Sequence, residues 1–243
     1  MGKGKKLITY GLVVLLCASS FSYWFYTIGK EDEYIATLSW VVADKKIVVD
    51  PGHGGIFPGK VGHNDIVEKE VNLAIAKRLA ELLSEGGAIV FMTRDSDVDL
   101  VGSTEGSLLQ KQRADLKNRV EIAKVQSADA FISIHCNSIP SPRWSGAQTF
   151  FDPENQESEV MAKNVQQELI KQLKNTKRQA IKREDTYLFR NLEIPTIIIE
   201  CGFLSNPKEA ELLTQEEYQH CIAFAIYSGL VKYYAQNVEQ VNG

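Results

Sequence analysis

The feature that most constrains the fold is an alternation, beginning near residue 45, of short apolar runs with longer segments of helical periodicity. The apolar runs predict strands at Lys46–Asp50, Ala88–Thr93, Ala130–His135, Gly146–Phe151 and Pro195–Glu200, and a marginal strand at Thr186–Phe189. The remaining periodicity predicts helices at Glu68–Ser84, Leu108–Val125, Glu157–Leu173 and Glu216–Tyr234. Because runs that are apolar throughout suit strands covered on both faces, the pattern predicts a single α/β domain. We expect a mostly parallel, twisted central sheet of about six strands, flanked by helices on both faces.

Length and charge narrow the classes of function. The chain has 243 residues, and the part that follows the N-terminal segment has a normal size for one domain with a sizeable core. The formal net charge is −4 and no long basic stretch is present. Because nucleic-acid-binding surfaces are strongly basic, no nucleic-acid partner is expected.

The N-terminus has the pattern of a membrane segment. Lys3, Lys5 and Lys6 precede an uncharged run from residue 7 to 29, and roughly 20 apolar residues suffice to span a bilayer. Lysines before such a run favour a cytoplasmic N-terminus and an exported C-terminal domain. The predicted division is a basic segment at 1–6, a transmembrane signal-anchor at 7–29, a linker at 30–44 and a globular domain at 45–238. A signal peptide cleaved near Cys17–Ser20 is the alternative.

Polar residues stand where three predicted strands end. The first strand runs into the Pro-Gly-His-Gly-Gly sequence that contains His53, the third ends at His135, and the last ends at Glu200. The helix after the first strand begins at Glu68, on the same edge of the sheet. Ligands of open α/β sheets bind outside the carboxyl ends of the strands, so we expect these four side chains to lie close together.

Two histidines and one carboxylate with an open fourth position form a known catalytic zinc site. Zinc lowers the pKa of a bound water toward about 7, and a second carboxylate beside that water can act as a general base. His53, Glu68, His135 and Glu200 supply these four groups.

Each of the four residues also has a simpler explanation. His53 can be a loop histidine that bonds backbone, or part of a phosphate-binding loop, although the Lys-Ser/Thr of a P-loop is missing. His135 can be a core histidine, and Glu68 can be an ordinary first-turn glutamate with Asp65 as the N-cap. Glu200 follows an apolar run, so its carboxylate needs either a partner or a shifted pKa.

Five segments, taken together and in order, resemble the zinc-dependent N-acetylmuramoyl-L-alanine amidases of bacterial cell walls. They are 47–55 (IVVDPGHGG), 68–73 (EKEVNL), 92–95 (MTRD), 133–137 (SIHCN) and 200–206 (ECGFLSN). Any one segment would be weak evidence, but five in the family's order are specific. The resemblance covers residues 46 to about 235 and implies that the globular domain is a zinc amidase catalytic domain.

The resemblance implies a role for each site residue. One Zn²⁺ per chain would be bound by His53, Glu68 and His135. Glu200 would be the catalytic base, which takes a proton from water and delivers it to the leaving amine as the muramic acid–L-alanine amide is hydrolysed. Asn137 and Arg94 are expected to position substrate.

A narrower resemblance is to the germination-specific, spore-cortex type of this family. It rests on residues 111–120 and 138–148, on the N-terminal segment and on the lack of an attached wall-binding domain. It implies that the substrate is the peptidoglycan of the spore cortex, between the two forespore membranes, as a step toward muramic-δ-lactam. Because some relatives depend on an accessory lipoprotein, it also implies such a partner.

Two other classes of function stay open at this point. One is a cysteine-dependent cell-wall hydrolase that uses Cys136 or Cys201 with His135. Strand alternation opposes it, because neighbouring side chains point to opposite faces. The other is a membrane-anchored glycan-binding module without catalysis, which would not require a carboxylate at Glu200.

Overall fold

The structure is a computed structural model that describes residues 10, 13–20, 35, 38–102 and 105–242. The chain divides into two compact units, Met1–Ser39 and Trp40–Gly243. In the first unit residues 13–20 are helical, while most of the predicted anchor at 7–29 lies outside the described residues. None of the helices in the described part of the chain has the length and apolar character needed to cross a membrane.

The second unit is built on a six-stranded sheet with the order β2-β1-β3-β6-β4-β5. Its strands are β1 (Lys46–Pro51), β2 (Ile89–Met92), β3 (Ala130–Asn137), β4 (Gln148–Phe151), β5 (Ile181–Lys182) and β6 (Thr196–Phe203). All neighbouring strands are parallel except β4 and β6, which are antiparallel. The predicted α/β fold with a mostly parallel sheet is therefore confirmed.

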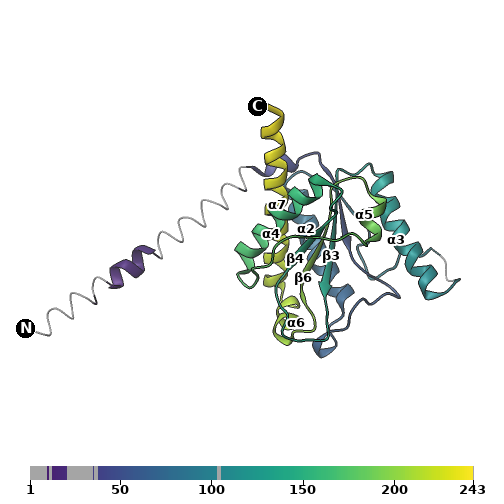
Figure 1. Cartoon of the computed structure of the whole chain (residues 1–243), viewed down its shortest axis with the longest axis horizontal. Helices are drawn as coiled ribbons and strands as arrows, with labels where there is room; N and C mark the ends of the chain where they lie inside the picture. Colours follow the sequence, from purple (N-terminus) through teal and green to yellow (C-terminus); the bar gives the residue numbers. More distant parts are fainter. Residues whose placement is uncertain (1–9, 11–12, 21–34, 36–37, 103–104, 243) are drawn as a thin grey trace, which may run out of the picture. The chain divides into compact units, whose positions relative to one another are not determined.

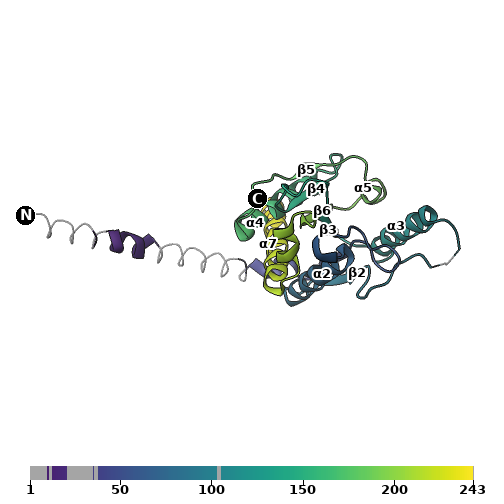
Figure 2. The same ribbon diagram turned by 90° about the horizontal axis from the view of Figure 1, so that it is seen from below.

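Helices cover both faces of this sheet (Figures 1 and 2). One face carries α2 (Glu68–Glu85), α4 (Gln156–Leu173) and α7 (Glu216–Asn242), and the other carries α3 (Leu108–Val125) and α5 (Tyr187–Asn191). The short helix α6 (Pro207–Leu213) follows β6, and two 3₁₀ turns lie at η1 (Ser39–Val42) and η2 (His63–Asp65).

The alternation of side chains along the strands decides which residues share a face. Val48, Phe131 and Ile198 belong to one buried apolar cluster with residues of α3 and α5. Because side chains two residues apart point the same way, His135 and Glu200 lie on the α3/α5 face of β3 and β6. These two residues are also register partners on adjacent strands.

Two differences from the predicted elements have clear physical reasons. The marginal strand predicted at Thr186–Phe189 is wrong, because Tyr187–Asn191 forms the short helix α5, which buries Leu188 and Phe189. A run of two apolar residues fits one helical turn as well as a strand. The two-residue strand β5 and the helix α6 were not predicted, since neither is long enough to show a period.

Candidate functional site

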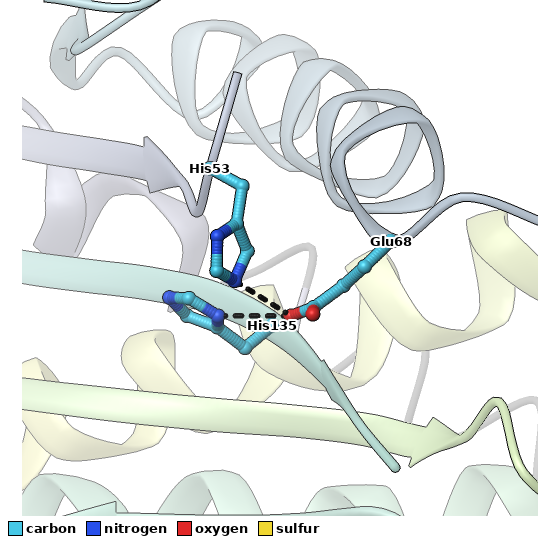
Figure 3. A group of neighbouring side chains, drawn as sticks. All are labelled: His53, Glu68 and His135. Carbon is cyan, nitrogen blue, oxygen red and sulfur yellow. Dashed lines mark hydrogen bonds and ion pairs between the residues drawn. The ribbon is translucent and has the colours of Figure 1, made fainter. Parts of the chain in front are cut away.

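The structure brings three of the predicted residues into one small group, formed by His53, Glu68 and His135 (Figure 3). His53 follows β1, Glu68 begins α2, and His135 lies near the end of β3. The Nε2 atom of His53 is 3.3 Å from Glu68 Oε1, and the Nδ1 atom of His135 is 3.0 Å from the same oxygen. One potential ligand atom from each residue lies within 4.8 Å of the others.

Glu68 is buried, with 2% of the residue exposed, and hydrogen bonds hold its carboxylate from several directions. The backbone N–H of Lys60 donates to Oε2 at 2.8 Å, and the backbone N–H of Cys136 donates to Oε1 at 3.2 Å. Burial raises the pKa of Glu68, but its hydrogen bonds to the two histidines outweigh this and hold it well below its ordinary value. Glu68 is therefore more than a first-turn glutamate, and the N-cap of α2 is Val67, which makes no side-chain cap, rather than Asp65.

The loop that carries His53 has an unusual backbone. His53 itself has φ of 65°, in the left-handed region that non-glycine residues rarely adopt. Two glycines of this segment allow close packing around the group: a Cβ on Gly52 would lie 2.2 Å from the His135 ring, and a Cβ on Gly59 would lie 2.6 Å from Glu68 Oε2. Such a backbone persists only when its surroundings hold it in place.

Two buried arginines hold this loop through hydrogen bonds to its backbone carbonyls. Arg94 Nε donates to the carbonyl of His53 at 2.6 Å, and Arg119 Nη2 donates to the same carbonyl at 2.7 Å. Both guanidinium groups also donate to the carbonyl of Pro51. The backbone orientation of His53 is therefore set by two cations that the loop itself does not contain.

Arg119 is in turn paired with two carboxylates. Its Nη1 lies 2.6 Å from Asp50 and its Nε 2.7 Å from Asp115, and all three side chains are buried. Burial raises the pKa of Asp50, but the charge of Arg119 and the hydroxyls of Ser133 and Thr93 hold it below its ordinary value. This network, formed by Asp50, Arg119 and Asp115, was not predicted. The only sequence signal was an aspartate at the end of an apolar run.

Glu200 stands beside the group of His53, Glu68 and His135, in a different environment. It is the register partner of His135, and 13% of its side chain is exposed. Its Oε2 is buried and has no hydrogen-bond partner among the described residues, and its Oε1 is 3.8 Å from Arg183 Nη1. Burial raises the pKa of this carboxyl, which the nearby positive charge of His135 only partly offsets.

The two residues expected to position substrate occupy different places. Arg94 is 3% exposed, and its guanidinium donates to backbone carbonyls, including those of Gly52, Lys69 and Ser96. The structure therefore gives Arg94 a part in holding the His53 loop. Asn137 is partly exposed at the carboxyl end of β3, two residues beyond His135.

The two cysteines next to the site are buried on strands β3 and β6. Cys136 and Cys201 are at most 2% exposed, and burial raises the pKa of both thiols well above the ordinary value. A nucleophilic cysteine must reach the substrate as a thiolate. Neither cysteine meets that requirement, so the geometry opposes a cysteine hydrolase.

The residues present fit a zinc ion. Two imidazole nitrogens and a carboxylate oxygen are the donors that catalytic zinc prefers. Glu68 Oε1 faces four nitrogens, from His53, His135, Cys136 and Asn72, whereas one carboxylate oxygen has about two lone pairs. A cation among the three ligand atoms would relieve this crowding.

Comparison with known proteins agrees with this geometry. A family model described as N-acetylmuramoyl-L-alanine amidase matches residues 47–232. The germination-specific N-acetylmuramoyl-L-alanine amidase of Bacillus subtilis (strain 168) is 39% identical over 236 residues, which are 97% of this chain and 98% of that protein.

Solved structures show the same similarity. The CwlD amidase from Clostridioides difficile, solved in complex with the GerS lipoprotein, is 42% identical with a TM-score of 0.77 and covers 79% of this chain and 99% of its own. The N-acetylmuramoyl-L-alanine amidase AmiC2 of Nostoc punctiforme is 30% identical with a TM-score of 0.66, and covers 78% of this chain and 96% of its own.

Proposed function

The chain belongs to the N-acetylmuramoyl-L-alanine amidase family, and from that premise we propose how its site hydrolyses the amide between N-acetylmuramic acid and L-alanine in peptidoglycan. The observation that carries the proposal is the group formed by His53, Glu68 and His135 beside the sparsely bonded carboxylate of Glu200. The group supplies metal ligands, and Glu200 supplies the acid–base function. A binding module without catalysis would need neither.

We assign the metal-binding role to His53 Nε2, Glu68 Oε1 and His135 Nδ1 and expect one Zn²⁺ per chain. Zinc held there would supply Lewis acidity for the scissile carbonyl and would make water nucleophilic near neutral pH. The buried network under the His53 loop keeps the first of these ligands in place. Partners that orient metal ligands in this way are a regular part of metal sites.

Glu200 is the proton carrier in this proposal. Its carboxylate accepts a proton from the attacking water and then gives it to the nitrogen of the leaving L-alanine. A buried carboxyl with a raised pKa suits that exchange, because it must be ionised before the attack and protonated after it. Asn137 remains a proposed substrate contact at the rim of the site.

The biological setting follows from the germination-specific relative. We propose that the substrate is spore-cortex peptidoglycan, and that the enzyme leaves muramic acid free of peptide for a later lactam-forming step. The GerS complex of the related amidase supports an accessory lipoprotein as a partner of this chain. Residues 45–238 would then face the space between the two forespore membranes.

Attachment to the membrane is a separate proposal, which rests on the N-terminal lysines and the uncharged run at 7–29. Alkaline phosphatase fused after Gly243 should be active, since that reporter works only when it is exported. Full-length protein should stay with the membrane fraction. A soluble form that begins near Ser20 would refute the anchor and leave the amidase assignment intact.

The experiment that tests the activity is digestion of purified sacculi by the full chain, with mass spectrometry of the products and metal analysis of the enzyme. We expect two products, muramic acid without its peptide and free peptides that begin with L-alanine. The enzyme should contain about one zinc per chain. Full activity of a metal-free preparation would contradict the assignment of the metal group. Products cut at a different bond would contradict the amidase assignment.

A further inference from the structure

Arg183 is an arginine beside Glu200 to which the proposed chemistry gives no role. It directly follows the two-residue strand β5, and its backbone N–H donates to the carbonyl of Phe151 at 2.9 Å. Its guanidinium carbon lies 3.7 Å from the centre of the Phe150 ring, and its Nη1 lies 3.8 Å from Glu200 Oε1. About a third of the side chain, 37%, is exposed. The group is therefore held by packing at the open edge of the site.

The N–H donors of the Arg183 guanidinium are not used within the described structure. Among the residues that the structure describes, it forms no hydrogen bond, and the 3.8 Å contact to Glu200 is too long to be one. Arg94 and Arg119, by contrast, donate to backbone carbonyls, and Arg119 also to carboxylates. A guanidinium has five N–H donors in a planar fork that matches a carboxylate. Because it is fixed in position while its guanidinium forms no hydrogen bond to a described residue, Arg183 has the character of a binding group for an anion.

The position of Arg183 indicates which part of the substrate it meets. This step rests on the proposed function, in which Glu200 gives a proton to the nitrogen of the leaving L-alanine. A group next to Glu200 therefore lies on the side of the peptide rather than the glycan. The anionic group that a peptide offers is a free carboxylate. The positive charge of Arg183 would attract that carboxylate and would offset the repulsion that Glu200 exerts on it.

We propose that Arg183 is a specificity-determining residue that binds a free carboxylate of the stem peptide, on the residue that follows L-alanine. The stacked ring of Phe150 orders the guanidinium before substrate arrives, which reduces the entropy lost on binding. The enzyme then prefers peptides whose second residue is anionic. Amidation of that carboxylate removes the charge and one acceptor oxygen, so amidated peptides are poorer substrates.

Two synthetic substrates test this directly: muramoyl-L-alanyl-D-glutamate with its γ-carboxyl blocked as an amide and a free α-carboxylate, and the same compound with an α-carboxamide in place of the carboxylate. The zinc-loaded wild-type chain should prefer the carboxylate by about 10–100-fold in kcat/KM, the range for a charge-assisted hydrogen-bonded pair. Arg183→Met keeps an apolar stem against Phe150 and should bring the preference close to one. The loss should appear mainly in KM, because ground state and transition state lose the same contact.

Two further variants separate recognition from a general loss of charge or fold. Arg183→Lys keeps the charge without the fork and should retain part of the preference. Arg190→Gln removes an exposed arginine of α5, which pairs with Asp185 before the helix, and should leave the preference unchanged. Zinc content and thermal unfolding of each variant establish that it is folded. If Arg183→Met does not fold, the wild-type ratio and the Lys variant still decide.

Some outcomes would overturn the inference. A wild-type chain that cleaves both substrates equally has no carboxylate preference to explain. An Arg183→Met variant that loses kcat equally on both substrates would make Arg183 a positioning residue for Glu200. A folded, zinc-loaded wild-type chain that cleaves neither substrate nor sacculi would overturn the proposed function itself, which distinguishes that failure from the others.

Discussion

The two sides of the site, one formed by His53 and Glu68 and the other by Glu200, differ in how densely they are hydrogen-bonded. On the side of the metal ligands, the carbonyl of His53 accepts hydrogen bonds from two buried arginines, and the carboxylate of Glu68 accepts bonds from backbone and side chains. On the other side, one buried oxygen of Glu200 has no hydrogen-bond partner within the described part of the chain, and its ion pair with Arg183 is long, at 3.8 Å. One region is densely bonded and the other is sparsely bonded, although His135 and Glu200 are direct neighbours in the sheet.

The difference matches the two tasks that we propose for these residues. Metal ligands need a fixed direction, and displacements of even a fraction of an ångström weaken coordination. An acid–base group must instead gain and lose a proton, so strong bonds that favour one of its states would slow the cycle. Dense bonding around Glu68 keeps the pKa of that carboxylate low, while sparse bonding and burial keep the pKa of Glu200 high. The comparison predicts that substitutions on the two sides have different consequences.

The largest expected effect is the loss of the metal itself. His53→Ala or His135→Ala should abolish both zinc binding and turnover, whereas Glu200→Gln should keep zinc and lower turnover by roughly 10²–10⁴-fold, the range for a lost acid–base group. Metal analysis and the rate of muropeptide cleavage measure the two effects separately. Loss of zinc in Glu200→Gln would make Glu200 a ligand and would remove the basis of the comparison.

The next effect concerns stability. Arg119→Met leaves Asp50 and Asp115 buried without their cation and should lower the free energy of unfolding by about 3–5 kcal/mol, as for other broken buried pairs. Denaturant unfolding of the metal-free chain measures this. Lys163→Met is the matched control, because its exposed pair with Glu159 is worth about 0–1 kcal/mol. Equal stability of the two variants would show that the network does not hold the loop.

The ion pair between Asp50 and Arg119 also makes the free energy of unfolding depend on pH. The folded pKa of Asp50 lies below its unfolded value, so its contribution is present above the unfolded pKa and is lost as pH falls through the folded pKa. The unfolded value of an aspartate is about 3.9, so the loss should begin below about pH 4. In Arg119→Met the folded pKa of Asp50 should shift upward, which shrinks this loss and, once the folded pKa exceeds the unfolded one, makes stability rise as pH falls. Unfolding curves at several acidic pH values would show the shift.

Much of the fold and part of the site could be predicted from the sequence, because long apolar runs and their polar ends are local signals. Five of the six strands, all but β5, lie close to their predicted ranges, and so do the four long helices α2, α3, α4 and α7. The convergence of His53, Glu68 and His135 follows from the rule that parallel strands end at one edge.

Non-local pairs explain what could not be predicted. Arg119 lies in α3 among many other charged residues, so nothing local distinguishes this buried arginine from a solvated one, and its partner Asp50 is 69 residues away. Arg183 owes its place to β5, which is too short to show a strand period. Arg94 lies in one of the segments on which the resemblance rests, but its burial next to the His53 loop is a property of packing.

A smaller effect should come from residues that support the metal ligands without touching the metal. Asn72 Nδ2 lies 3.4 Å from Glu68 Oε1 and 3.2 Å from the carbonyl of Gly52, so it connects the ligand to the loop. Asn72→Ala should weaken zinc affinity by about 10–100-fold without unfolding the domain. Competition with a chelator measures the change. Asn175→Ala, which removes an exposed bond to Tyr218, should leave zinc affinity unaltered, and equal affinities for all three proteins would refute the role of Asn72.

The smallest effect is expected at the cysteines, although they adjoin the most sensitive residues. Cys136 supports Glu68 only through its backbone N–H, which a substitution retains, and Cys201 is a buried neighbour of Glu200 on β6. Their thiols point away from the site, because side chains alternate along a strand. Cys136→Ala and Cys201→Ala should therefore keep zinc and most activity, with a loss of stability of about 1 kcal/mol for each small cavity. A thiol alkylator should not inactivate the folded enzyme, whereas a chelator should. Inactivation by the alkylator that Cys136→Ala or Cys201→Ala prevents would restore the cysteine-hydrolase alternative and contradict the metal assignment.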